Sequence, residues 1–182
     1  VYSVEGDIPA YGFIAFGIID RGTNVLQVRP TTICPLNCIF CSVDAGPYSI
    51  HRWAEYIVKP AILVNGVLYA ARYKGGGLEA LIDTIGDPLT YPYLIELIRE
   101  LRSIPYIRSV AVETHGALLS YKLVNKLEEA GLSRINLSID TLSPEKAKFL
   151  QGMPWFDLDR VIKIAEYIAR ETNIDLHVTP IW

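Results

Sequence analysis

The sequence alternates between short β-branched segments and longer amphipathic segments, and this alternation constrains the fold more than any other feature. Each strand-plus-helix unit takes roughly 30 to 40 residues, which indicates a parallel sheet with right-handed crossovers. Five interior strands are expected at residues 25–29, 78–85, 109–114, 134–139 and 175–181. Helices are expected at residues 60–74, 93–103, 120–131 and 157–172, with a short one that begins at residue 143. The fold is therefore an open doubly wound sheet or a barrel-like (βα) array.

Residues 12–20 form a further expected strand, which is followed by a turn at residues 21–24. This turn predicts that the strand is hairpinned onto the one at residues 25–29. We therefore divide the chain into an N-terminal extension, 1–24, and a (βα) array, 25–182. Neither Gly-x-Gly-x-x-Gly nor a Walker sequence follows any expected strand, so the nucleotide-binding forms of the open sheet lack support.

Composition excludes several classes of protein. The chain has 182 residues, is 51% hydrophobic and 20% charged, and is therefore not a disordered chain. Apolar runs all stay below the ~18 residues of a membrane span, and acidic residues occupy the start, where a signal peptide would be basic. Basic residues are not concentrated, so the electrostatic footprint of a nucleic-acid-binding protein is missing. We expect a cytoplasmic protein that does not act at a membrane.

The two ends of the sequence suggest a piece of a longer protein. The chain begins at Val1, its one methionine is Met153, and residues 176–182 resemble a strand that is cut short. Glutamine is scarce, whereas tyrosine, isoleucine and charged side chains are plentiful, which weakly favours a thermophilic source.

Polar or ligand-type residues occur at the end of every expected strand. In parallel (βα) folds the carboxyl ends of the strands form the catalytic face. In chain order these residues are the three cysteines, Gly86, Asp87, Thr114, His115, Ser138, Asp140 and Thr179. The alternative is that loops are polar in general and that some of these residues only cap helices.

The three cysteines, Cys34, Cys38 and Cys41, are clustered and odd in number, which does not suit a disulfide framework. Clustered thiols without bridging partners indicate a reducing compartment and a metal site. Tetrahedral zinc would require a fourth ligand, and the histidines are scattered. Three thiolates alone suit a [4Fe–4S] cluster with one open iron, to which a cofactor or substrate could bind. Three buried thiols, or a zinc loop completed by a histidine, stay the alternatives.

The motif Cys34-x-x-x-Cys38-x-Phe40-Cys41, after the first strand of a (βα) array, resembles that of the radical S-adenosylmethionine (radical SAM) superfamily. The resemblance implies a partial (βα)6 TIM-like barrel, here truncated after its fifth strand. It also implies that SAM chelates the open iron, and that an external one-electron reductant of the ferredoxin or flavodoxin kind is required. Reductive cleavage of SAM then yields a 5′-deoxyadenosyl radical, which abstracts a substrate hydrogen.

Other segments resemble the subgroup around the molybdenum-cofactor biosynthesis enzyme that rearranges GTP. Ile85-Gly86-Asp87-Pro88 is similar to its Gly-Gly-Glu-Pro motif, with Ile85 and Asp87 as departures. Aspartate is one methylene shorter than glutamate, so a bridging water or a backbone shift would have to compensate. The residues for which the resemblance implies a role in binding SAM are Phe40, Gly86, Asp87, Thr114, Ser138 and Thr179. The segments 41–48 and 85–92 also resemble an archaeal group, which implies no particular substrate.

Two residues are candidates for the chemistry itself. His115 could act as an acid or base near neutral pH, or only satisfy a hydrogen bond at a strand end. Asp83 would be costly inside a barrel unless it is paired, and a paired Asp83 would be a functional candidate. Arg29, at the end of its strand, could meet a carboxylate or form a structural salt bridge. His177 is expected to be a core histidine.

The substrate could be a modified RNA base, a peptide side chain or a small cofactor precursor. The alternative function is a non-catalytic module that binds zinc or carries an iron–sulfur cluster for electron transfer.

Overall fold

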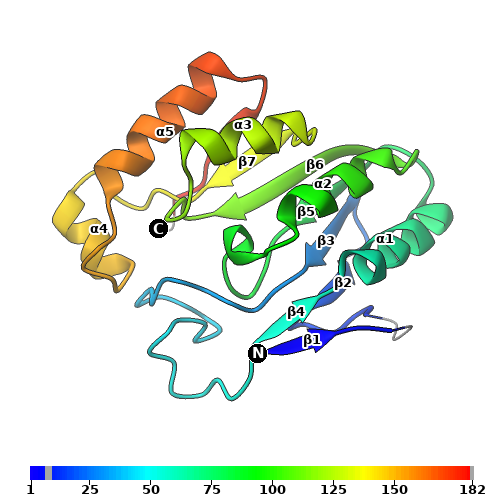
Figure 1. Ribbon diagram of the computed structural model, residues 1–182, viewed down its shortest axis with the longest axis horizontal. Helices are drawn as coiled ribbons and strands as arrows, with labels where there is room; N and C mark the ends of the chain where they lie inside the picture. Colours follow the sequence, from blue (N-terminus) through cyan, green and yellow to red (C-terminus); the bar gives the residue numbers. More distant parts are fainter. Residues whose placement is uncertain (7–9, 181–182) are drawn as a thin grey trace.

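The computed structural model describes residues 1–6 and 10–180. Within that part of the chain, the main sheet has six strands in the order β2-β3-β5-β6-β7-β8 (Figure 1). Strand β2 pairs antiparallel with β3, and the other neighbouring pairs are parallel. The strands are β2 (Gly17–Asp20), β3 (Val25–Arg29), β5 (Leu78–Ile82), β6 (Ile107–Thr114), β7 (Arg134–Leu137) and β8 (Asp175–Val178). The predicted parallel array and its antiparallel hairpin are confirmed, whereas the division of the chain at residue 24 stays a prediction.

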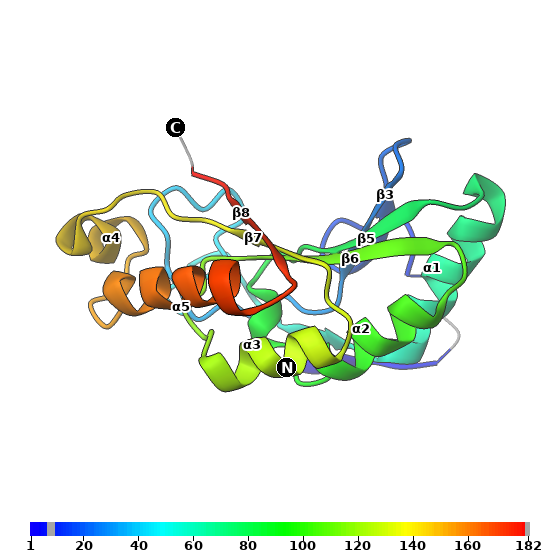
Figure 2. The ribbon, with the colours of Figure 1, turned by 90° about the horizontal axis from the view of Figure 1, so that it is seen from above.

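The helices lie mainly on one face of this sheet. They are α1 (Pro60–Lys74), α2 (Leu94–Ser103), α3 (Tyr121–Glu129), α4 (Pro144–Leu150) and α5 (Leu158–Glu171), with a short 3₁₀ helix, η1 (Pro88–Thr90). Figure 2 shows α1, α2, α3 and α5 on the same side of the strands. This one-sided cover is that of a partial (βα) barrel, because crossovers of one hand place successive helices on one side of a sheet that curves. Among the described residues, no helix combines the length and the apolar character that a membrane span requires.

The helix sequences explain how the sheet is covered. The buried residues of α2 recur three and four positions apart, as an apolar stripe on one helix face does. They are Leu94, Leu97, Ile98 and Leu101. Ser120 and Asp157 cap α3 and α5, because each side chain accepts a backbone hydrogen bond from the first turn of its helix. The core of the protein therefore lies between these helices and the sheet.

Three expectations need correction. Strand β5 ends at Ile82 instead of residue 85, so Asp83 lies just beyond the strand. His177 is exposed and is not a core histidine, because β8 is the last strand in the order of the sheet. The predicted fifth strand was also too long, since β8 ends at Val178 and residue 181 lies outside the described residues.

A second, two-stranded sheet was not predicted from the sequence. It pairs β1 (Tyr2–Val4) in parallel with β4 (Tyr56–Val58). Strands of three residues are too short to show a periodic pattern, so the pairing depends on tertiary structure. Strand β4 begins where the long loop of residues 30–55 ends. This loop crosses the carboxyl ends of the parallel strands and reaches α4 (Figure 1).

Candidate functional site

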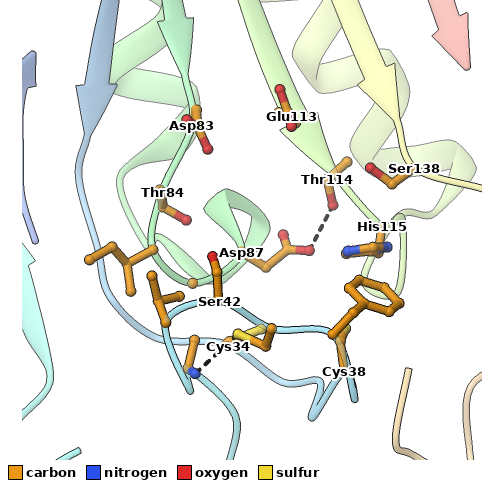
Figure 3. A pocket seen from close by; sticks show the side chains of 16 residues that line it. Cys34, Cys38, Ser42, Asp83, Thr84, Asp87, Glu113, Thr114, His115 and Ser138 are labelled. Atoms are coloured by element: carbon orange, nitrogen blue, oxygen red, sulfur yellow. Dashed lines mark hydrogen bonds between the residues drawn. The ribbon is translucent and has the colours of Figure 1, made fainter. Parts of the chain in front are cut away.

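A pocket of about 270 Å³ lies at the carboxyl ends of the parallel strands. Its walls come from the loop after β3 and from the ends of β5, β6 and β7 (Figure 3). The lining residues are Cys34, Cys38, Phe40, Cys41, Ser42, Val43, Ala45, Asp83, Thr84, Ile85, Gly86, Asp87, Glu113, Thr114, His115 and Ser138. Parallel strands bring their carboxyl ends to one edge, which is why residues so far apart in the sequence share this pocket.

All three cysteines are free and line the pocket. Their loop is folded back on itself, since Cys41 N donates to Cys38 O at 3.0 Å and Ala45 N donates to Cys41 Sγ at 3.3 Å. Burial raises the pKa of the Cys34 thiol to about 11 and that of the Cys38 thiol to about 12. Both thiols therefore carry protons at neutral pH, which a metal must displace when it binds them.

The donor set fits an iron–sulfur cluster better than a single metal ion. Thiolates are the usual ligands of [4Fe–4S] clusters, in which each cysteine binds a different iron, so the sulfurs stand apart. Within residues 1–6 and 10–180, no three His, Cys, Asp or Glu side chains are grouped so that they could hold one metal ion. The geometry therefore gives no support to a zinc loop completed by a histidine.

Gly86 and Asp87 are locked against the segment that leads into the cysteine loop. Asp87 N donates to Ile33 O at 2.9 Å, and a Cβ at position 86 would lie 2.0 Å from the same oxygen. This close approach of two backbone segments requires glycine. Asp87 is buried, and its carboxylate accepts hydrogen bonds from Leu89 N at 2.9 Å and from Thr114 Oγ1 at 2.8 Å (Figure 3). Burial raises the pKa of Asp87, although these hydrogen bonds act in the opposite direction.

His115 follows β6 and faces the cysteine side of the pocket (Figure 3). Its Nδ1 lies 3.8 Å from Asp140 Oδ2, which is beyond hydrogen-bonding distance. In the described part of the chain, this buried nitrogen has no hydrogen-bond partner. Burial lowers the pKa of His115, against the opposing charges of Asp140 and Asp87. A neutral imidazole, with the ring centroid of Phe40 6.1 Å from its own, therefore forms part of the wall.

Ser138 and Thr179 differ in their position relative to the pocket. Ser138 lines the pocket, whereas Thr179 is not among the lining residues. The two hydroxyl oxygens lie 3.4 Å apart, so Thr179 stands beside Ser138 without reaching the cavity wall. The pocket thus brings together five of the residues expected to bind SAM: Phe40, Gly86, Asp87, Thr114 and Ser138. The sixth, Thr179, contacts Ser138 and does not line the pocket.

Asp83 and Glu113 lie at the end of the pocket away from Cys34 and Cys38 (Figure 3). Asp83 directly follows β5, and Glu113 lies in the neighbouring strand β6. Asp83 accepts a hydrogen bond from Gln27 Nε2 at 2.8 Å, and its Oδ2 lies 3.6 Å from Arg29 Nη2, so Asp83 is paired and Arg29 forms a salt bridge. Burial raises the pKa of Asp83, while the charge of Arg29 lowers it.

Glu113 and Gln151 were not identified from the sequence. A glutamate within the otherwise apolar end of a strand was a usable signal for Glu113, because a buried carboxylate is costly. Burial, and then the charge of Asp83, raise the pKa of Glu113. Gln151 is 2% exposed and contacts Cys38 from a position 113 residues away, and the sequence pattern carries no sign of this contact.

We expect Glu113→Gln to raise the melting temperature at neutral pH by a few degrees. A carboxyl whose pKa is raised by folding stabilises the protein below its unfolded pKa of 4.5, and this contribution is lost as the pH rises through the folded pKa. The advantage of Glu113→Gln should therefore shrink as the pH falls to about 4. Calorimetry at both pH values measures the difference, with Glu129→Gln at an exposed position of α3 as the control. An equal advantage at both pH values would show that the charge of Glu113 is not the cause.

A one-sided (βα) barrel with a three-thiol pocket at its carboxyl edge defines the class, a barrel enzyme with an iron–sulfur site. The sequence matches the family model of the Radical SAM superfamily over residues 28–180. The chain therefore belongs to the radical SAM superfamily, whose enzymes use a [4Fe–4S] cluster and SAM.

Two relatives illustrate the similarity at the level of sequence. The uncharacterized protein MJ0103 of Methanocaldococcus jannaschii is 41% identical over 181 residues, which cover 98% of this chain and 42% of the relative. The probable GTP 3′,8-cyclase of Pyrococcus abyssi is 35% identical over 144 residues, which cover 79% of this chain and 42% of the relative. The chain thus spans less than half the length of these relatives.

Solved structures with low sequence identity share the fold. Streptococcus suis SuiB bound to S-adenosylmethionine aligns with a TM-score of 0.68 at 20% identity, over 92% of this chain and 35% of that chain. Native anSMEcpe with bound AdoMet aligns with a TM-score of 0.66 at 17% identity, over 85% of this chain and 42% of that chain. The barrel architecture predicted from the sequence is therefore confirmed.

Proposed function

We propose that this protein cleaves SAM reductively and abstracts a hydrogen atom from a substrate in the same pocket. The observation that carries the proposal is that Cys34, Cys38 and Cys41 share one pocket with polar side chains from the ends of neighbouring strands. Cys34, Cys38 and Cys41 would hold the cluster, which would supply the electron for reductive cleavage of SAM and, with SAM, the radical chemistry that removes a substrate hydrogen. The residues of the chain bind, orient and shield these groups.

The three cysteines are the ligands of the cluster, and their number leaves one iron without a protein ligand. Asp87 is placed to bind the ammonium group of SAM. Each of its carboxylate oxygens already accepts one hydrogen bond, from Leu89 N or Thr114 Oγ1, and keeps a further acceptor position. Ser138 offers its hydroxyl from the next strand end, and the neighbouring Thr179 orients that hydroxyl.

The end of the pocket that carries Asp83 and Glu113, away from Cys34 and Cys38, suits the substrate. There, Asp83 is held by Gln27 and Arg29, while Glu113 has a raised pKa and could donate or accept a proton. His115, neutral and short of one hydrogen bond, is a second candidate for proton transfer. A modified RNA base, a peptide side chain and a small cofactor precursor fit this chemistry. The name of the Pyrococcus abyssi relative, a probable GTP 3′,8-cyclase, makes a purine nucleotide the first compound to test.

An electron donor is required in addition to the substrate. We propose a ferredoxin-like or flavodoxin-like protein, because either carries single electrons at low potential. The three free, clustered thiols support a reducing compartment, and we propose the cytoplasm.

The proposed activity is tested by product analysis. The purified protein is reconstituted anaerobically with iron and sulfide, then mixed with SAM, with or without dithionite. We expect 5′-deoxyadenosine and methionine in equal amounts, and only when dithionite is present. The proposal fails if protein with a full complement of iron and sulfide forms no 5′-deoxyadenosine. One zinc ion per chain without labile sulfide would instead favour a metal-binding module.

A further inference from the structure

The side chain of Gln151 is buried between Cys38 and Asp140. Cys38 Sγ donates to Gln151 Oε1 at 2.8 Å, and Gln151 Nε2 donates to Asp140 Oδ2 at 2.9 Å. The residue is 2% exposed, and a primary amide is costly to bury unless both of its ends are hydrogen-bonded. Both ends are bonded here, one of them to a cysteine of the cluster motif.

The backbone fixes Gln151 in this position. The carbonyl groups at the end of α4 accept hydrogen bonds from the cysteine loop, Asn37 N to Gln151 O and Ile39 N to Leu150 O, both at 3.0 Å. The next residue, Gly152, has φ +63°, and a Cβ there would lie 1.9 Å from Asn37 O. The end of α4 and the cysteine loop are therefore one packed unit, which holds the backbone of Gln151 beside the cysteine loop.

The bonding of Cys38 must change when it binds iron. A thiol donates to Oε1, but an iron-bound cysteine is a thiolate, which has no proton and only accepts. An amide carbonyl facing a thiolate would be repelled by it. A half-turn of the amide removes this repulsion, because it exchanges Oε1 and Nε2 at almost the same positions.

The half-turn of the amide also changes the hydrogen bonding of Asp140, for which His115 is a new partner. With Nε2 turned to Cys38, Oε1 faces the carboxylate of Asp140, which loses that N–H and must move away from the amide oxygen. The Nδ1 atom of His115 is 3.8 Å from Asp140 Oδ2, is buried, and has no hydrogen-bond partner among the described residues. A small movement of Asp140 toward His115 would replace the lost hydrogen bond and satisfy this nitrogen.

We propose that Gln151 is a positioning residue for the cluster, and that its Nε2 donates a hydrogen bond to the iron-bound Sγ of Cys38. The inference rests on the proposed function, because it requires a cluster on the three cysteines. Hydrogen bonds to the sulfurs of a cluster stabilise its reduced, more negative state and so raise the reduction potential. Gln151 therefore makes the cluster easier to reduce before SAM is cleaved.

The test is an EPR-monitored redox titration of the reconstituted protein. Gln151→Leu keeps the volume and loses the N–H donor, and Gln151→Glu places an acceptor against the thiolate. We expect Gln151→Leu to disfavour reduction about tenfold, which is about 59 mV for a one-electron couple, and Gln151→Glu to disfavour it more. Glu145→Gln, at an exposed position of α4, is the matched control and should leave the potential unchanged.

A second measurement uses the unmodified protein and so does not depend on the folding of a variant. Glutamine labelled with ¹⁵N in its side-chain amide should give a ¹⁵N coupling to the reduced cluster in pulsed EPR. A loaded cluster without this coupling, or with an unchanged potential in Gln151→Leu, overturns the inference alone. Wild-type protein that takes up no iron and sulfide overturns the proposed function, and this inference with it.

Discussion

Cys38→Ala is expected to take up no [4Fe–4S] cluster and to form no detectable 5′-deoxyadenosine. The pocket offers three thiols, and removal of one leaves two, which is too few to retain the cluster. Hydroxyl and carboxylate groups of the pocket are hard ligands and do not replace a soft thiolate. Iron and labile-sulfide analysis after reconstitution measures the loss, and product analysis follows it.

The control for this variant is Ser42→Ala, which changes another lining residue of the same loop and removes no thiol. We expect it to load the cluster as the wild type does. Circular dichroism should show folded protein for both variants, since Cys38 is replaced by a smaller apolar side chain. Full iron and sulfide uptake by Cys38→Ala would contradict the ligand assignment.

Gly86→Ala is expected to lower the free energy of unfolding by about 1–3 kcal/mol, as overpacking of a close contact does. The added Cβ would lie 2.0 Å from Ile33 O and 2.7 Å from Thr32 O, and both atoms belong to the backbone. One of the two segments must therefore shift, and Asp87, which donates to Ile33 O, moves with it. Urea unfolding measures the stability, and titration of the reconstituted protein with SAM should show weaker binding.

Gly76→Ala is the matched control for Gly86→Ala. A Cβ at position 76 meets no atom within 4 Å, so its effect on unfolding should be small. An equal loss of stability in both variants would mean that the flexibility of glycine matters and the close approach to Ile33 does not.

Much of the fold could be predicted because local patterns and global topology agree in this sequence. The apolar stripe of α2 and the caps Ser120 and Asp157 define helices without any tertiary information. The short interior strands then require parallel pairing, since helices separate them. The strands β1 and β4 escaped prediction because each has three residues and is set by its partner. His177 was placed wrongly because its exposure depends on the position of β8 at the edge of the sheet, which alternation along the strand does not reveal.

The candidate site divides in a similar way. The cysteines, Asp87 and Ser138 were predictable, because their place at strand ends follows from the order of the elements. The hydrogen-bond partners of these residues could not be predicted from the sequence. Contacts such as Gln151 to Cys38 and Thr114 to Asp87 join side chains from different elements, and their geometry follows only from packing.

The most direct test of the central claim is the EPR spectrum of the dithionite-reduced, reconstituted protein before and after addition of SAM. Three cysteine ligands leave one iron open, so SAM should bind that iron and shift the g-values of the reduced cluster. We therefore expect a [4Fe–4S]⁺ signal that changes with SAM and reaches a limit as the site fills. A cluster signal that stays the same at all SAM concentrations would contradict the account, because it would mean that no iron is open to SAM.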